Sequence, residues 1–427
     1  MISVGLADAV MLCSLAIAIG AYIFVSRREG SYVNILTPSA LVGIPAFYLL
    51  PLIYIHLFQP EGTAYAYEYI YATLAVQNIA FAYFYIRTNG KLIRLPFRFG
   101  RANFWAFSIV CVILAGLVYV PILLEFPQYI LNPRQIYAET RTGFGASSFT
   151  SATLAFLGVI FVLFSDRSRL RKGLVIAAAL VVLSLHGSKG QILEAVFFML
   201  FYFLYVKGKR FSLGAAVIGA AFVSGTVLLL FAASMTLGES PMEVVQSISE
   251  YSDYTRNDML VIDSHLPPQF GRLVLESNTI SVIPRVLMPS KPKNFGAFYL
   301  AEEFFPERFD ADTGAPAFAI GVHYADFGWL AIVYLGCFSA LTGWLARISV
   351  NRLRITHHPA DLILVAFMAD VTLFPVGGGG WFFPETLLVV LLVRYISCFG
   401  ADTVYREHVS ARVSGALPSS FSPMRKA

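Results

Sequence analysis

Charged side chains are scarce in this chain of 427 residues: Asp, Glu, Lys and Arg make up 13% of it, whereas soluble domains average about 25%. Hydrophobic residues make up 57%, in apolar runs that recur from one end of the chain to the other. A soluble domain does not tolerate that balance, so the composition predicts a protein that lies in a membrane.

Cysteine is also rare, and its four residues all lie inside apolar runs, with no CxxC pair and no Cys/His cluster: Cys13, Cys111, Cys337 and Cys398. The pattern supports neither a disulfide framework nor a zinc site. HExxH, Walker and GxSxG motifs are missing, and so is an outward DxD pair that would hold a divalent metal. We therefore expect no metal and no cofactor, and Arg and Lys are the evident groups for neutralising phosphate.

The apolar runs are close to twenty residues long, which is the length that a helix needs to cross a bilayer. They predict an all-α, polytopic membrane protein with about eleven transmembrane helices in one domain over residues 1–400. The expected spans are 5–26, 37–58, 64–86, 103–126, 150–166, 173–187, 190–206, 212–236, 319–346, 361–376 and 384–400.

Basic residues predict the orientation, because Lys and Arg concentrate in cytoplasmic loops. Every second loop between the expected spans lies on the same side of the membrane. One such set of loops, together with the C-terminal tail, holds 22 of the 31 Lys and Arg. That side is expected to be cytoplasmic, which places the N-terminus in the periplasm and the C-terminus in the cytoplasm. The polar tail, residues 401–427, is expected to be disordered.

Nine basic residues face the other side, so topology does not explain them. Most of them lie in two long outer loops, 127–149 and 237–318. The larger loop carries twelve acidic residues against six basic ones. Long loops in compact proteins are usually functional, so the outward bases are candidates for binding an anion.

Two short glycine-containing motifs carry single outward bases. In "YAETRTGFGASS", Arg141 precedes two glycines that let the backbone approach a ligand; the alternative is a tight turn with an exposed arginine. In "HGSKG", Lys189 lies between two short spans at the outer rim of the membrane. A plain turn with a snorkelling lysine is the alternative, but ionisable residues at that depth are usually functional.

The largest group of bases is "SVIPRVLMPSKPKNFGAF", where Arg285, Lys291 and Lys293 lie among three prolines. Proline-restricted backbone holds cations in place, which suits a multiply charged anion, whereas the alternative is a solvated basic turn. Upstream, "SDYTRND" places Arg256 between two aspartates, either as part of a site or as a salt-bridged helix surface.

A fourth motif, "GVHYADFGWLA", begins the expected ninth span. His323 and Asp326 lie at its outer mouth, where either side chain could accept a proton from a hydroxyl nucleophile. The alternative is that Tyr324 and Trp329 anchor the helix at the interface, with His323 as a polar cap. Asp370 lies inside the tenth span, and the sequence assigns it no clear role.

Taken in order, "TRTGFG", "GSKG", "IPRVLMPSKPKNFG" and "GVHYADFGWLA" resemble the motifs of Wzy-type O-antigen and exopolysaccharide repeat-unit polymerases. The resemblance covers about residues 1–400 and implies a metal-independent membrane glycosyltransferase of the bacterial inner membrane. Such enzymes move a growing glycan from one undecaprenyl-diphosphate carrier to a sugar unit on another, at the periplasmic face. Relatives often have twelve spans, one more than the runs predict here.

The resemblance also implies roles for particular residues and partners. The diphosphate ligands would be Arg141, Lys189, Arg285, Lys291 and Lys293, and the catalytic residues would be His323, Asp326 and Arg256. The partners would be the lipid-linked oligosaccharide, membrane lipid, a chain-length regulator and a flippase, with no nucleic acid. Three rival functions stay open: an O-antigen ligase, a transporter of polysaccharide or lipid, and a structural membrane scaffold.

Overall fold

A computed structural model describes most of the chain: residues 4–58, 63–88, 103–130, 135–136, 144–187, 189–219, 221, 225, 249, 252–280, 283, 287–310, 318–373 and 384–398. Arg141, Arg285 and the polar tail lie outside these ranges, as does most of the expected span 212–236. Within the described residues every regular element is a helix, which confirms the all-α prediction.

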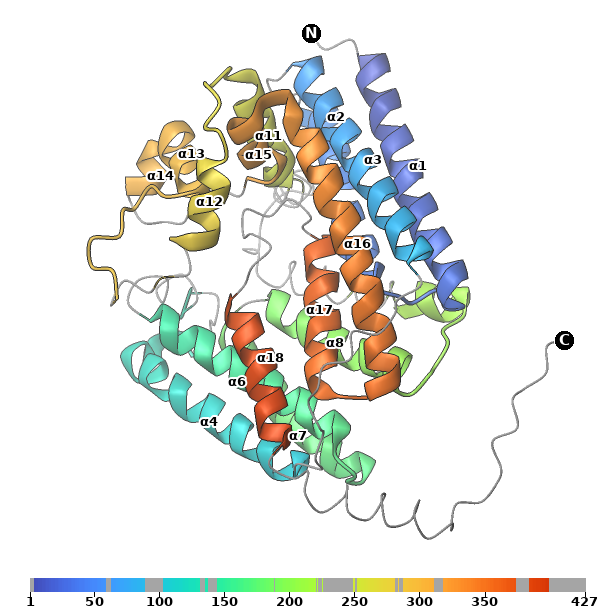
Figure 1. The fold of residues 1–427 in the computed structure, drawn as a ribbon. Coiled ribbons are helices and arrows are strands. Elements are labelled where there is room, and N and C mark those ends of the chain that lie inside the picture. The colour runs from blue at the N-terminus through green and yellow to red at the C-terminus, as the bar shows by residue number, and fades with distance from the viewer. Residues whose placement is uncertain are drawn as a thin grey trace, which may run out of the picture.

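The first half of the chain forms α1 (Val4–Glu29), α2 (Leu50–Phe58), α3 (Ala64–Arg87), α4 (Phe104–Glu125), α6 (Gly145–Phe164), α7 (Arg169–Leu185) and α8 (Lys189–Phe201). The second half forms α11 (Asp253–Asp263), α12 (Arg272–Thr279), α13 (Ala297–Phe304), α14 (Pro306–Asp310), α15 (Ile320–Phe327), α16 (Ala331–Thr356), α17 (Pro359–Leu373) and α18 (Pro384–Cys398). Figure 1 shows α1, α3 and α16 side by side, and α11 to α15 gathered at one end.

Five helices in the described part of the chain are long and apolar enough to cross a membrane: Ala7–Glu29, Ser39–Leu57, Phe104–Glu125, Gly145–Phe164 and Ile320–Thr356. Tyrosine-rich α3 is not among them, because its many tyrosines and other polar residues lower its hydropathy. It packs against α1 and α16 and buries Tyr67, Tyr71 and Tyr85. The helical membrane class is therefore confirmed, and the number of eleven or twelve spans stays a prediction.

A glycine lets α16 approach α3 closely. A Cβ atom on Gly343 would lie 2.4 Å from the carbonyl oxygen of Phe81, so any other residue would push the two helices apart. Small residues have this role in membrane helix pairs, because lipid provides no hydrophobic force between helices and close packing must supply the attraction.

The second span is interrupted. Two π-helical turns, Ser39–Gly43 and Pro45–Leu49, precede α2, and Pro45 and Pro51 supply no backbone N–H to a helical ladder. The Tyr71 hydroxyl donates to the carbonyl oxygen of Phe47 at 3.0 Å, which replaces the hydrogen bond that the N–H of residue 51 would otherwise make. The break is thus compensated by a neighbouring helix.

Buried ion pairs join the helix ends on the side predicted to be cytoplasmic. Glu29, at the end of α1, accepts hydrogen bonds from Arg347 and Arg354 of α16, and from the Tyr85 hydroxyl of α3 at 3.0 Å. The Glu29 side chain is fully buried and the Arg347 side chain is 10% exposed. One carboxylate therefore connects three helices.

Asp361 makes a second such cluster at the start of α17. Its carboxylate pairs with Arg394 and, at 2.8 Å, with Arg352, and it accepts from the Thr356 hydroxyl. All of these bases belong to the set that the charge bias assigns to the cytoplasm. The fold thus pairs these bases with two buried carboxylates, and the side of the membrane on which they lie stays a prediction.

The large outer loop contains α11 to α14, which pack with α15 around a core of their own. That core includes Val261, Leu273, Leu300, Phe318 and Val322, all at most 3% exposed. The expected ninth span, 319–346, is also divided: α15 ends at Gly328, whose φ of +58° suits glycine, and α16 then runs on to Thr356. The outer segment is therefore a packed group of short helices, which we call the outer helical group (residues 252–280, 287–310 and 318–327).

Candidate functional site

Carboxylates of the outer helical group cap the N-termini of its own helices. Asp258 on α11 is 1% exposed and accepts from the backbone N–H groups of Ala319, Ile320 and Gly321 at 2.8–2.9 Å. These donors begin α15, where the helix dipole favours negative charge. Burial raises the pKa of Asp258 to about 7, and the three N–H donors oppose that rise.

Asp326, at the far end of α15, has the same role for another helix. It is fully buried, and its two carboxylate oxygens accept from the N–H groups of Leu273 and Val274 at 3.0 and 2.8 Å, at the start of α12. On α12 in turn, Glu276 accepts from the N–H of Gly296 at 2.8 Å, just before α13. Four helices are thus connected in series by acids, which accounts for part of the acidic excess of this segment.

Removing the first of these acids should loosen the group. We expect Asp258→Ala to lower the free energy of unfolding by about 1–3 kcal/mol, because three buried N–H donors lose their acceptor. Thermal unfolding of the purified protein measures the change. Asp253→Ala is the matched control, since Asp253 lies on the same helix with a side chain that is 52% exposed. Equal melting temperatures for the two variants would contradict the capping role.

His323 lies on α15 with its ring against Tyr334, at 5.3 Å between ring centroids. It is 7% exposed, and its Nδ1 is buried without a hydrogen-bond partner among the described residues. Whereas both oxygens of Asp326 accept from the backbone, His323 therefore has a ring nitrogen that no described residue uses. Such an unused buried group requires an explanation, and a ligand or substrate is one.

Arg256 on α11 has protein partners. Its guanidinium pairs with Asp253 and lies 4.4 Å from the ring centroid of Tyr54 in α2. These contacts are those expected of an arginine that joins the outer helical group to the second span. Both interpretations of this residue, site and helix surface, are therefore compatible with its geometry.

The basic turn is described from Leu287 to Asn294. Lys291 donates from Nζ to the Ile283 carbonyl at 2.9 Å and lies 4.6 Å from the Phe295 ring centroid, and Lys293 is exposed. The two lysines thus lie on one turn just before α13, and their role in binding an anion stays a prediction. Arg285 and Arg141 lie outside the described residues, so their placement relative to this turn is a prediction.

The "HGSKG" motif forms the connection between α7 and α8, and Lys189 is the first residue of α8. His186 anchors the turn: its ring nitrogens lie 3.2 and 3.1 Å from the hydroxyls of Ser148 and Ser151, and its ring lies against Tyr119. Gly187 follows with φ +65°. The predicted break between two helices is thus present, with His186 attached to α4 and α6; its outward placement stays a prediction.

Two acids inside apolar helices join the candidate site. Glu194 lies five residues into α8, and Asp370 lies three residues before the end of α17. Both side chains are exposed although their helices pack against each other, and the two carboxyl groups are close enough to interact electrostatically. The sequence analysis missed Glu194; a charged residue inside the run 190–206 was the available indication.

The described residues thus offer lysines on the basic turn, carboxylates on α8 and α17, and an imidazole on α15. This combination can neutralise a phosphate and receive a proton from a hydroxyl. Among the described residues, no three His, Cys, Asp or Glu side chains come together to hold a metal ion.

Comparisons with known proteins identify relatives along nearly the whole chain. The O-antigen polymerase of Salmonella typhimurium is 32% identical over 402 residues, which cover 94% of this chain and 96% of the relative. The O-antigen polymerase of Salmonella typhi matches to the same extent. No family model and no solved structure matches. At this identity over this length, the chain belongs to the O-antigen polymerase family, as its motifs predicted.

Proposed function

We propose that the protein polymerises oligosaccharide repeat units, linked to undecaprenyl diphosphate, into O-antigen or exopolysaccharide. The reaction would take place at the periplasmic face of the bacterial inner membrane. The observation that carries the proposal is the match to O-antigen polymerases over 94% of the chain. Lys291 and Lys293, which lie together on the described basic turn, support it.

The chemistry follows from the bond that breaks. A hydroxyl of the acceptor sugar attacks the anomeric carbon of the donor, the carbon–oxygen bond to the diphosphate breaks, and the lipid diphosphate leaves with the negative charge. Fixed cations stabilise that charge in the transition state. We assign this role to Arg141, Lys189, Arg285, Lys291 and Lys293, without a metal or cofactor.

The hydroxyl proton needs an acceptor. In the outer helical group His323 retains an unused ring nitrogen, whereas both oxygens of Asp326 accept from the backbone, so we propose that Asp326 acts by positioning α12. Arg256 would hold α11 against Tyr54 beside this group. Glu194 is a second proton acceptor, because it lies within two turns of Lys189 and faces Asp370.

Variants separate the two proton acceptors. If Glu194 is the base, Glu194→Gln should lower the rate of chain extension by about 10²–10⁴-fold, since the amide keeps the shape but cannot take a proton. Extension is measured by the lengths of lipid-linked glycans made by purified protein. Glu125→Gln, exposed at the end of α4, is the control. A full rate in Glu194→Gln combined with a loss in His323→Ala would assign the proton to His323.

The nearest alternative is an O-antigen ligase, which would use the same donor and transfer the glycan to lipid A core. Glycan analysis of a deletion strain distinguishes the two. Loss of a polymerase leaves single repeats attached to core, whereas loss of a ligase leaves long chains on the lipid carrier. We expect single repeats.

Transport of polysaccharide or lipid is the alternative from another class. Purified protein in liposomes without an ion gradient should elongate lipid-linked repeats if it is a polymerase, and a transporter would leave repeat length unchanged. We further propose that the N-terminus is periplasmic, the C-terminus cytoplasmic, and that a chain-length regulator and a flippase act with the protein.

A further inference from the structure

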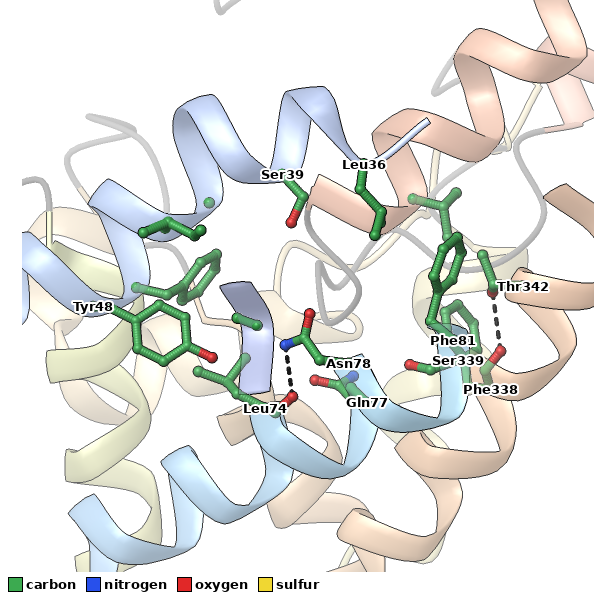
Figure 2. A pocket seen from close by; sticks show the side chains of 15 residues that line it. Leu36, Ser39, Tyr48, Leu74, Gln77, Asn78, Phe81, Phe338, Ser339 and Thr342 are labelled. Atoms are coloured by element: carbon green, nitrogen blue, oxygen red, sulfur yellow. Dashed lines mark hydrogen bonds between the residues drawn. The ribbon is translucent and has the colours of Figure 1, made fainter. Parts of the chain in front are cut away.

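A cavity of about 50 Å³ lies within the bundle, between α1, the interrupted second span, α3, α16 and α17. Phe47, Tyr48, Phe81 and Phe338 form much of its wall. Figure 2 shows Ser39, on the first π-helical turn, pointing toward Asn78 and Gln77 of α3. The cavity thus combines an aromatic wall with a polar side.

Two polar side chains on this cavity are buried without partners. Gln77 is 2% exposed, and neither its amide nitrogen nor its amide oxygen has a hydrogen-bond partner among the described residues. Ser339 is 3% exposed, and its hydroxyl likewise has none there. Their neighbours differ: Asn78 donates to the Leu74 carbonyl at 2.8 Å, and Thr342 donates to the Phe338 carbonyl at 3.0 Å.

The position inside the bundle makes these unused groups costly. Gln77 lies near the middle of α3, which runs from Ala64 to Arg87 and packs against α1 and α16, so bulk solvent does not reach its side chain. A buried amide with both ends unpaired among the described residues requires a ligand that can donate and accept.

We propose that this cavity binds hydroxyl groups, supplied by a small cluster of ordered water that hydrogen-bonds Gln77 and Ser339. None of the described side chains that line the cavity is charged, so an ion would lack a counter-charge. A water needs about 10–15 Å³ of such space, so a cavity of about 50 Å³ has room for about three to five waters. A hydroxyl group or a water both donates and accepts hydrogen bonds, so it can pair with the Gln77 amide and with the Ser339 hydroxyl.

Radiolytic hydroxyl-radical labelling tests the proposal on the full-length protein in lipid nanodiscs, because X-rays convert ordered water into radicals that oxidise the adjoining side chains. Tyr48, Phe81 and Phe338 should be labelled faster than Phe161, which is 1% exposed and does not line the cavity. Gln77→Met should reduce their labelling to the rate of Phe161, and Ser339→Ala should reduce it in part.

A matched control lies on the same helix. The hydroxyl of Thr73 is buried but already donates to the Tyr69 carbonyl at 2.8 Å, so Thr73→Val should leave the labelling unchanged. Gel filtration shows whether each variant is folded. If Gln77→Met does not fold, Ser339→Ala is the variant that tests the proposal.

The second source of a hydroxyl is a lipid alcohol. Native mass spectrometry distinguishes a bound lipid alcohol from water. If the protein retains one alcohol molecule that Gln77→Met releases, and the aromatic residues are not labelled fast, the cavity is still a hydroxyl site but its occupant is the alcohol. Labelling of all three aromatic residues at the rate of Phe161, with no alcohol retained, would overturn the proposal. It would leave the polymerase function untouched, because that function is measured by glycan length.

Discussion

Glu29→Gln is expected to destabilise the protein by about 3–5 kcal/mol, because removing one partner of a buried ion pair leaves the other charge uncompensated. Here one carboxylate serves two arginines, Arg347 and Arg354, and the Tyr85 hydroxyl. Glutamine keeps the shape and one acceptor oxygen but removes the negative charge. The measurement is thermal or denaturant unfolding of the purified protein in detergent.

Glu303→Gln is the control, since Glu303 is exposed on α13 and its charge is solvated. Exposed charges contribute about 0–1 kcal/mol, so this variant should unfold like the unaltered protein. A triple variant with Glu29→Gln, Arg347→Met and Arg354→Met should recover much of the loss, because apolar side chains can replace a buried ionic cluster. Equal stability of Glu29→Gln and Glu303→Gln would show that the cluster contributes nothing.

Arg285→Ala should reduce chain extension by about 10²–10³-fold, which is the loss seen when one group that stabilises an oxyanion transition state is removed. Lys189→Ala should have an effect of the same order, and both proteins should reach normal abundance. Arg285→Lys should also lower the rate, because lysine cannot make a bidentate contact with phosphate. Lipid-linked glycan lengths in cells that carry each variant measure the result.

Arg272→Ala is the control for an outward arginine with partners inside the protein. Arg272 is 47% exposed, lies 3.7 Å from Glu276 and stacks over Tyr299 at 4.8 Å from the ring centroid. We do not assign it to the phosphate, and its removal should leave extension near the normal rate. Full-length polymer from both Arg285→Ala and Lys189→Ala would show that the cation hypothesis is wrong.

Much of the fold was predictable from local sequence. Ten of the eleven expected spans coincide with helices in the described residues, and the turn at "HGSKG" separates α7 from α8 as expected. The interruption of the ninth span at Gly328 was not predicted, because an apolar run continues through the break and hydropathy does not register a single glycine. The helices inside the large outer loop were missed for a related reason, since they are short and amphipathic.

The candidate site was predictable only in part. Asp326 was a candidate base because it lies at the expected outer mouth of the ninth span. In the structure both of its oxygens accept from the N-terminus of α12, more than fifty residues away in sequence. Asp258 likewise has distant partners, because its three N–H donors are 61 to 63 residues away in sequence. A sequence lists the acid but not its partner.

The sequence by itself determined the helical membrane class, the approximate positions of the spans and the family. These properties depend on run length, composition and short motifs, all of which are local. The tertiary structure alone decided what surrounds the polar groups of the bundle: Glu29 pairs with arginines some 320 positions away, Glu194 lies near the like-charged Asp370, and Gln77 lines an interior cavity. The physical reason is that the free energy of a buried polar group depends on what lies within a few ångströms of it, and in this bundle those neighbours come from helices far apart in the chain.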